Sequence, residues 1–172
     1  MLLRITDYKD IDERKLMDVY NESNFENTDY FYPNEKNKEV AVKSVEEGFL
    51  DYLKNDFFII PGSTYWVLEE NGVWISALRT NLISKGLYYI EALETRPDFR
   101  KKGYTTSLLN QIIETLKKEG PFRLCSCVSK KNEASLKVHQ KCGFKIVSED
   151  GYNYLLNDYE FMDYGLEYAN LG

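Results

Sequence analysis

The sequence predicts one α/β domain of the α+β type, in which a mixed, mostly antiparallel central sheet of six or seven strands is flanked by about four helices. Three observations predict this class. Over residues 64–95 the helical spacing gives way to runs of apolar and aromatic residues that are typical of strands. The stretches on both sides of them carry apolar residues at helical spacing. A length of 172 residues suits one domain, and no repeat, low-complexity tract or linker divides it, so we take residues 1–172 as a single domain.

The first 54 residues predict one strand and two helices. An acidic residue, Asp10 or Asp12, can cap the first helix. Pro33 and the Asn and Asp residues before it favour a loop ahead of the second helix. In chain order we expect a strand over 2–6, a helix from Asp10 or Asp12 to about Asn21, a loop over 24–33 and a helix over 35–54.

The middle of the chain predicts an antiparallel meander. Asn71-Gly72, between two runs that predict strands, is a strong signal for a tight hairpin turn. Pro97 stops the third run, because proline cannot donate a hydrogen bond to a neighbouring strand. The expected strands cover 64–69, 73–82 and 86–95.

The last third predicts a crossover followed by closing strands. A helix that begins near Gly103 carries an apolar stripe and ends at Gly120-Pro121. Because this helix separates strand 86–95 from the next apolar run, 122–128, we expect those two strands to be parallel. After them we expect a helix from Asn132 to Gly143, and then closing strands over 145–149 and 153–161 around the turn Asp150-Gly151.

The composition narrows the classes of function. The net charge of −6 argues against nucleic-acid binding, which needs clustered cations, and it suits a cationic substrate such as an amine. Three cysteines (Cys125, Cys127 and Cys142) and one histidine are too few for a disulfide framework or a metal site, so we expect reduced thiols and no metal. The N-terminal residues lack the apolar run of a signal peptide, and no stretch is long enough to cross a membrane. We therefore expect a cytoplasmic protein with no membrane partner.

The turn between Pro97 and Gly103 favours an anion. The first amides of a helix have no partner within the helix, and together with the helix dipole they attract negative charge. Gly103 permits a positive φ, and Arg100, Lys101 and Lys102 add positive charge. A pyrophosphate suits such a turn, although a solvated basic loop would have the same sequence. The turn is neither a Walker loop nor a dinucleotide fingerprint, since it lacks the glycines and the Gly-Lys-Ser/Thr that those motifs need.

Two segments together resemble the acetyl-coenzyme A (acetyl-CoA) motif of the GNAT superfamily of N-acetyltransferases. They are Leu93-x-Thr95-x-Pro97-x-x-Arg100-x-x-Gly103-x-Thr105 and the run from Asn132 to Phe144, which follows at the distance that the family has. The expected order of elements agrees with the family over nearly the whole chain. The resemblance implies a single GNAT-like domain that uses acetyl-CoA as cosubstrate.

The resemblance also implies which residues hold the cosubstrate. Backbone groups of Leu93 and Thr95 would bond the pantetheine arm, which Asn132 would also contact. Backbone amides from Lys101 to Thr106 would hold the pyrophosphate. The acetyl thioester would lie in the V between strands 86–95 and 122–128. The implied cofactor-binding residues are Leu93, Thr95, Arg100, Lys101, Lys102, Gly103, Tyr104, Thr105, Thr106 and Asn132.

Three positions depart from the family pattern. Thr105 stands where Gly or Ala is usual, but it is small enough to leave phosphate binding intact. Thr95 stands in place of a common Val, which matters little if its backbone makes the contact. His139 stands where many members have a tyrosine that protonates the departing thiolate, so this change affects the mechanism.

Glu91 and His139 are the predicted catalytic residues. In the family's reaction an amine attacks the thioester carbonyl directly, which requires a base for the amine and an acid for the thiolate. Glu91, two residues before Leu93, can be that base or a surface carboxylate. His139 can be the acid, as an imidazolium, or a packing residue. We expect Glu94 on the opposite face of a regular strand, and we expect Cys127 to be a buried thiol rather than a nucleophile.

The aromatic run Tyr30-Phe31-Tyr32, with Glu91, is the predicted acceptor site, because this region helps to wall that site in the family. An aromatic loop packed on the core is the alternative. The sequence thus predicts an N-acetyltransferase for a primary amine that is a small molecule, an aminoglycoside-like molecule or a peptide. A non-catalytic acyl-CoA-binding sensor or regulatory domain of the same fold stays open because of His139. The family implies a monomer or a homodimer.

Overall fold

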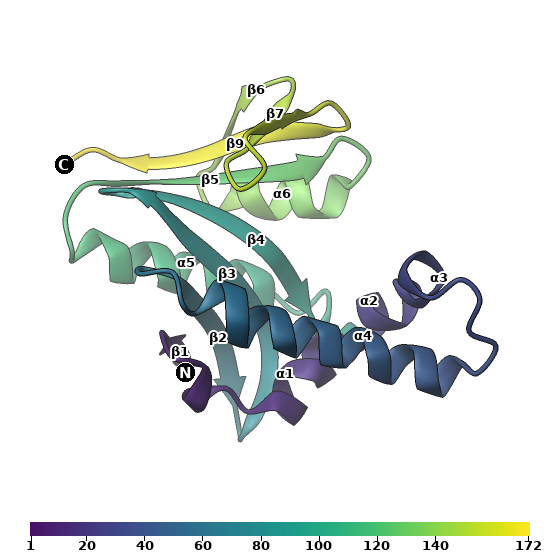
Figure 1. The fold of residues 1–172 in the computed structure, drawn as a ribbon. Helices are drawn as coiled ribbons and strands as arrows, with labels where there is room; N and C mark the ends of the chain where they lie inside the picture. The colour runs from purple at the N-terminus through teal and green to yellow at the C-terminus, as the bar shows by residue number, and fades with distance from the viewer.

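Seven strands form one mixed sheet in the order β1-β2-β3-β4-β5-β9-β6, in a computed structural model that describes residues 1–172 (Figure 1). Neighbouring strands are antiparallel except β4 and β5, which are parallel. The meander and the single parallel step are therefore confirmed. The strands are β1 (Leu2–Ile5), β2 (Thr64–Glu70), β3 (Val73–Ser84), β4 (Leu87–Thr95), β5 (Phe122–Ser129), β6 (Lys145–Ser148) and β9 (Asp163–Asn170).

Four longer helices correspond to the four expected from the sequence. They are α1 (Glu13–Val19), α4 (Lys38–Tyr52), α5 (Tyr104–Lys117) and α6 (Glu133–Lys141). Short 3-10 or π turns cover Tyr8–Asp10, Leu53–Phe57 and Pro97–Phe99. Side chains of Asp12, Asn37 and Asn132 cap α1, α4 and α6, whereas α5 starts at Gly103 without a side-chain cap. None of the helices combines the length and the apolar character that crossing a bilayer requires.

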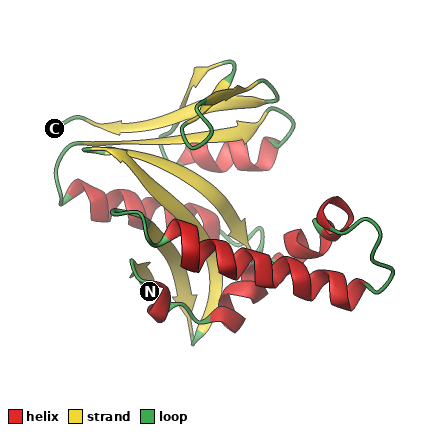
Figure 2. Ribbon diagram, viewed as in Figure 1, coloured by secondary structure: helices red, strands yellow, loops and turns green.

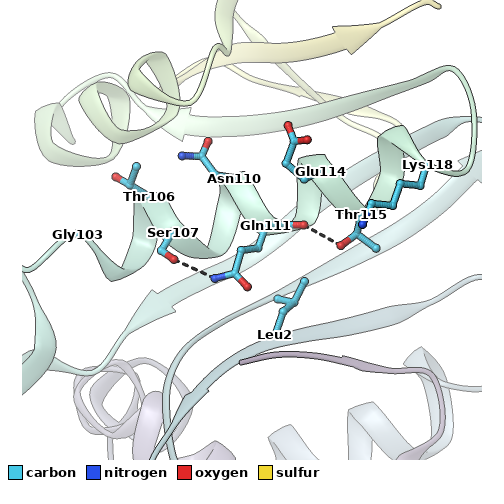
Figure 3. Close-up of a pocket in the computed structure, with 9 residues that line it drawn as sticks. All are labelled: Leu2, Gly103, Thr106, Ser107, Asn110, Gln111, Glu114, Thr115 and Lys118. Carbon is cyan, nitrogen blue, oxygen red and sulfur yellow. Dashed lines mark hydrogen bonds between the residues drawn. The ribbon is translucent and has the colours of Figure 1, made fainter.

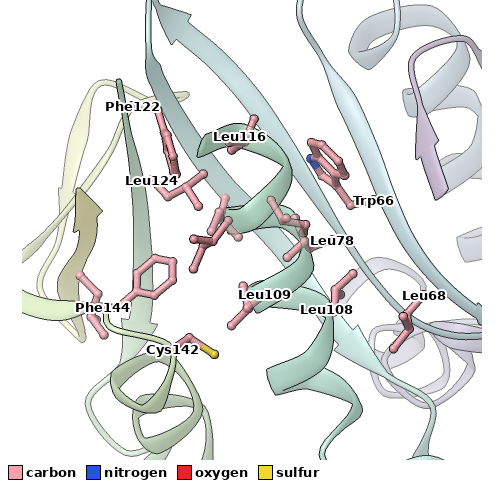
Figure 4. Packing of buried hydrophobic residues seen from close by; sticks show 14 of the residues in the cluster. Trp66, Leu68, Leu78, Leu108, Leu109, Leu116, Phe122, Leu124, Cys142 and Phe144 are labelled. Carbon is pink, nitrogen blue, oxygen red and sulfur yellow. The ribbon is translucent and has the colours of Figure 1, made fainter. Parts of the chain in front are cut away.

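Alternate residues of β2 enter two separate cores, one on each face of the sheet. Trp66 and Leu68 pack in the core that α5 covers (Figure 4). Tyr65 and Val67 pack in the core that α1 and the end of α4 cover. Successive strand side chains point to opposite faces, so the sheet lies between two helical layers, with α4 in front and α5 behind in the view of Figure 2. The apolar stripe of α5 is buried as the sequence predicts: Leu108, Leu109, Ile112, Ile113 and Leu116.

Residues 24–33 are not the loop that the sequence predicts. Most of them belong to two short helices, α2 (Asn21–Glu26) and α3 (Thr28–Phe31). Thr28 is buried, and its hydroxyl accepts a hydrogen bond from Nζ of Lys38 at the start of α4 (2.6 Å). This contact between segments fixes the helical turns, and the sequence pattern gives no sign of it.

The predicted closing strand over 153–161 is also wrong. This segment folds back on itself as a separate hairpin of β7 (Gly151–Asn153) and β8 (Asp158–Glu160). The side chain of Asn153 accepts hydrogen bonds from the amides two and three residues later (2.9 and 3.1 Å), which makes a tight turn. The sheet is closed instead by β9, which lies between β5 and β6 and pairs with both.

Candidate active site

β4 and β5 lie side by side over part of their length and then diverge (Figure 1). Their parallel pairing ends at Ile90 and Ser126. Beyond it lies a cavity of about 230 Å³ between β4, β5 and α6, which we call the acid–base cavity. The residues that line it include Glu91, Leu93, Cys127, Ser135, Asn132 and His139. The fold thus brings both predicted catalytic residues and two predicted cofactor contacts to one place.

β4 carries a one-residue bulge beside this cavity. Ala92 has a φ of 55°, and the register against β3 shifts between Glu91 and Glu94. The phenol of Tyr20 donates a hydrogen bond to the carbonyl oxygen of Ala92 (2.6 Å), which holds the bulge from the core beneath. Ala92 and Leu93 have no partner in the register with β3, and β5 has already diverged. Neither residue therefore has a directly opposite partner on a neighbouring strand.

The bulge places Glu94 on the same face as Glu91, contrary to the expectation for a regular strand. These two residues lie opposite Ala77 and Arg79, which are two apart on β3 and so share a face. Glu94 lies 3.5 Å from the guanidinium of Arg100. Burial raises the pKa of Glu94, and Arg100 offsets part of that rise.

Glu91 is held on one side by two donors from β3. Nε of Arg79 donates to Oε1 of Glu91 (3.0 Å), and the amide of Asn81 donates to the same oxygen (3.2 Å). Oε2 accepts no hydrogen bond from a protein group. One carboxylate oxygen is thus fixed while the other stays available to a ligand.

His139 is almost completely buried, with 1% of its surface exposed. Its Nδ1 lies 2.8 Å from the carbonyl oxygen of Ser135, so this nitrogen carries the proton and donates it. Its Nε2 then has the lone pair, is buried and has no hydrogen-bond partner. Burial lowers the pKa of His139, and the bond to Ser135 offsets part of that shift. The imidazole therefore favours the neutral form, with an acceptor nitrogen on a residue that lines the acid–base cavity.

Cys127 lines the same cavity as a thiol. Burial raises its pKa, and its Sγ lies 3.5 Å from the carbonyl oxygen of Tyr152. All three cysteines are free, and no group of three or more His, Cys, Asp or Glu side chains is arranged to hold a metal ion.

A second cavity, of about 250 Å³, lies at the N-terminus of α5; we call it the lysine cavity. Lys101 and Gly103 have positive φ values of 61° and 84°, and this tight coil precedes the first free amides of the helix. Lys137 and Lys141 line the cavity from α6. Sequence reasoning missed these two lysines, although their spacing of four places them on one helix face. The predicted cofactor residues that line the cavity are Lys101, Gly103, Tyr104, Thr105 and Thr106.

Two predicted cofactor residues direct their side chains elsewhere. Arg100 donates from Nε to the carbonyl oxygen of Thr95 (3.1 Å) and from Nη1 to Glu22 (2.8 Å). Nζ of Lys102 donates to the carbonyl oxygen of Asp98 (3.2 Å). Neither residue lines the lysine cavity. Their side chains hold the shape of the turn, and the positive charge of the cavity comes from the three lysines.

Thr95 and Thr105, which both depart from the family pattern, are hydrogen-bonded to each other through their hydroxyls (2.6 Å). Thr95 is buried, and its hydroxyl also lies 2.7 Å from that of Ser76 on β3. These bonds tie the end of β4 to the first turn of α5. The side chain of Thr95 therefore faces the protein interior.

A groove of about 590 Å³ runs along α5 from Gly103 to Lys118 (Figure 3). Its polar side chains bond mainly to their own helix: Gln111 donates to Ser107 (2.9 Å) and Thr115 to the carbonyl oxygen of Gln111 (2.8 Å). The groove meets the lysine cavity at Gly103 but shares no residue with the acid–base cavity. It contains neither predicted catalytic residue.

Phe31 and Tyr32 line a third cavity, of about 380 Å³, between α2, α3, α4 and β3. Tyr30, the third predicted acceptor residue, does not line it and is 80% exposed. Arg79 and Tyr52 line this cavity from β3 and α4. Sequence reasoning missed both residues, because neither the alternation of a strand nor the spacing of a helix reveals which side chains will line a cavity between elements.

The acetyltransferase (GNAT) family model matches residues 10–144 of the chain. The chain has the fold of the PaiA N-acetyltransferase from Thermoplasma acidophilum, solved with coenzyme A, at a TM-score of 0.66 and 16% identity over 99% of both chains. It is similar to the ribosomal-protein-S18-alanine N-acetyltransferase from Escherichia coli, at a TM-score of 0.61 and 14% identity over 100% of this chain and 96% of that one. It is also similar to yncA from Salmonella typhimurium, solved with acetyl-CoA, at a TM-score of 0.59 and 15% identity over 98% and 92%. No curated protein matches the chain in sequence.

Proposed function

Because this chain belongs to the acetyltransferase (GNAT) family, we propose that it is an N-acetyltransferase that moves the acetyl group of acetyl-CoA to a primary amine. One observation carries the proposal: α6 lines two cavities at once. It faces the lysine cavity with Lys137 and Lys141, and it faces the acid–base cavity with Asn132 and His139. This arrangement suits a long cosubstrate whose pyrophosphate binds in the lysine cavity and whose thioester end reaches the acid–base cavity.

The free hydrogen-bonding groups of the site suit acetyl-CoA. The backbone amides from Lys101 to Thr106 lie at and just before the start of α5, a helix of 14 residues, and three lysines line the same cavity, which favours a pyrophosphate. The backbone of Leu93, which has no opposite partner on β3 or β5, can bond the amides of pantetheine as a neighbouring strand would. Oδ1 of Asn132 caps α6, which leaves its side-chain amide to donate to the same arm. When bound, acetyl-CoA supplies the activated acetyl group.

Glu91 and His139 divide the proton transfers in this proposal. Glu91, fixed through Oε1, orients the amine with Oε2 and takes the proton of the ammonium form. His139, neutral and with its lone pair on Nε2, accepts a proton from the amine nitrogen as the bond to the acetyl carbon forms, and returns it to the departing sulfur. The proton that reaches the sulfur therefore originates on the amine, and no standing imidazolium is needed.

A matched pair of glycine variants tests the cosubstrate site. Gly103 and Gly72 both have positive φ (84° and 76°) and open space where a Cβ would lie, so replacement by Glu imposes similar backbone strain at both. Gly72 lies in the turn between β2 and β3 and does not line the lysine cavity. We expect Gly103→Glu to weaken acetyl-CoA binding by about 10-fold or more through charge repulsion, and Gly72→Glu to bind like the parent. Calorimetric titration measures this, and equal affinities in all three proteins would contradict the proposed pyrophosphate site.

Release of coenzyme A with a panel of primary amines tests the transfer itself. Turnover with at least one amine supports the enzyme. A parent protein that binds acetyl-CoA but releases no coenzyme A with any amine would instead be the acyl-CoA sensor.

A further inference from the structure

The third cavity, of about 380 Å³, is lined by Arg79, the ion-pair partner of Glu91. Four of its ten lining residues are aromatic, Phe31, Tyr32, Phe49 and Tyr52, and Asn24, Asn27 and Ser44 add uncharged polar groups. Arg79, on β3, is its one charged lining residue. A mainly apolar cavity with a single cation suits a ligand that has an apolar body and one anionic group.

Arg79 is nearly enclosed, with only 11% of its side chain exposed. Its guanidinium lies 5.4 to 5.9 Å from the ring centres of four aromatic residues on α4, the following turn and β2. Only Nε donates a hydrogen bond to a protein oxygen, that of Glu91 (3.0 Å). The terminal nitrogens, Nη1 and Nη2, donate no hydrogen bond to a carboxylate or a carbonyl oxygen. The buried phenol of Tyr65 lies beside the guanidinium, and the remaining N–H groups can bind a ligand.

One ion pair joins this cavity to the acid–base cavity. Arg79 lines the third cavity and Glu91 lines the acid–base cavity, yet their bonded atoms are 3.0 Å apart. The two charges cancel, so the pair is complementary to a ligand that also carries one positive and one negative group close together. A guanidinium binds a carboxylate through two parallel hydrogen bonds, which neutral acceptors cannot match.

We propose that the acceptor is an amine that carries a carboxylate next to it, an α- or β-amino acid with an apolar side chain. Its carboxylate binds Nη1 and Nη2 of Arg79, its amine lies at Oε2 of Glu91, and its apolar part packs on the aromatic walls. This inference rests on the proposed acetyl transfer, whose acceptor class it narrows.

Three matched acceptors test the proposal on the parent protein: L-phenylalanine, L-phenylalaninamide and 2-phenylethylamine, each with saturating acetyl-CoA. We expect kcat/KM for coenzyme A release to be about 10-fold or more higher with the amino acid than with the amide. The amine of the amide is less basic than that of the amino acid, so a larger fraction of it is unprotonated and reactive. Amine basicity therefore cannot explain a higher rate with the amino acid. If L-phenylalaninamide or 2-phenylethylamine reacts as well as L-phenylalanine, the proposed carboxylate recognition is wrong, but the proposed acetyl transfer is not affected.

Binding of the reaction product separates this inference from catalysis. We expect calorimetry to detect N-acetyl-L-phenylalanine about 10-fold or more tighter than its amide, in the presence of coenzyme A. If no amine is acetylated but the acid still binds more tightly than its amide, the result contradicts the proposed acetyl transfer and supports carboxylate recognition by Arg79. Equal affinity for acid and amide overturns the recognition itself.

Arg79→Gln, with Arg14→Gln as its control, tests the residue. Arg14 is an exposed arginine on α1, with 84% of its side chain accessible. We expect Arg79→Gln to bring the ratio of kcat/KM for acid over amide close to one, mainly through KM, while Arg14→Gln keeps the parent ratio. An Arg79 that only orients Glu91 would instead lower kcat on all three acceptors alike. If Arg79→Gln does not fold, as judged by circular dichroism, the acceptor series on the parent decides.

Discussion

His139 differs from a surface histidine because its two nitrogens are in different situations. Nδ1 is bonded to the backbone of its own helix, whereas Nε2 is buried without a partner. The ring also packs edge-on against Phe144, with centroids 5.0 Å apart. The unpartnered nitrogen is costly in a folded protein, which favours a role in ligand binding or proton transfer over a packing role.

His139→Phe removes the acceptor nitrogen but keeps an aromatic ring beside Phe144. We expect kcat for coenzyme A release to fall by about 100-fold, the usual scale of one general acid–base group. Acetyl-CoA affinity, measured by calorimetry, should change little. Equal turnover in parent and variant would remove His139 from the proposed mechanism.

The pH dependence of the free energy of unfolding, compared between the parent and His139→Phe, reports on the charge state of His139. Burial lowers the pKa of the folded imidazole below that of the unfolded chain, so the unfolded chain binds the proton first as the pH falls. The stability due to the neutral ring is present above about pH 6.5 and is lost as the pH falls through the folded pKa. Because the chain has one histidine, urea unfolding between pH 7.5 and pH 5 should show a larger loss in the parent than in the variant. Parallel losses would contradict a lowered pKa.

At the scale of elements, the site depends on how the end of β4 is joined to the start of α5. The two threonines that break the family pattern bond each other across this joint, Thr95 on β4 and Thr105 on α5. Either change alone looks unimportant in the sequence. The two changes are explained together, because each hydroxyl is a hydrogen-bond partner of the other.

A double-mutant cycle with Thr95→Val and Thr105→Val measures this joint. We expect each single variant to lower the free energy of unfolding by about 1 kcal/mol, because it removes the hydrogen bond between the two hydroxyls. The double variant should lose about 1 kcal/mol less than the sum of the two. Urea unfolding gives the three values, and strict additivity would show that the two hydroxyls act independently.

The bulge in β4 decides which carboxylates meet the cleft. The sequence predicts strand 86–95 correctly, but a regular strand would separate Glu91 and Glu94 onto opposite faces. The extra residue at Ala92 brings them to one face, and Tyr20, from the end of α1, bonds the carbonyl that turns there. The periodicity of β4 alone could not reveal a bulge whose stabilising contact comes from more than seventy residues away.

At the scale of the whole molecule, β9 completes the half of the sheet that carries β5 and α6. It pairs along the full length of β5, and β6 has no other neighbour in the sheet. Leu166 of β9 is buried in the core beneath α5. The wall of the acid–base cavity therefore depends on the last strand of the chain.

Deletion of residues 163–172, with deletion of Leu171 and Gly172 as its control, tests this dependence. The long deletion removes β9, leaves β6 without a partner and exposes an edge of β5. We expect it to abolish cooperative thermal unfolding and to cause aggregation on size-exclusion chromatography. The short deletion removes two exposed residues outside any strand and should behave like the parent. A monomeric, cooperatively folded long deletion would contradict the structural role of β9.

The sequence by itself determined the order of the main elements, the parallel step from β4 to β5, the buried stripe of α5 and the turn at Gly103. These features follow from local periodicity and from the backbone preferences of single residues, which act over a few positions in the chain. Only the tertiary structure decided the placement of β9, the bulge at Ala92, the meeting of Lys101 with the lysines of α6, and the enclosure of Arg79. Each of these depends on contacts between distant segments, whose packing and hydrogen-bonding energies leave no periodic trace in the sequence.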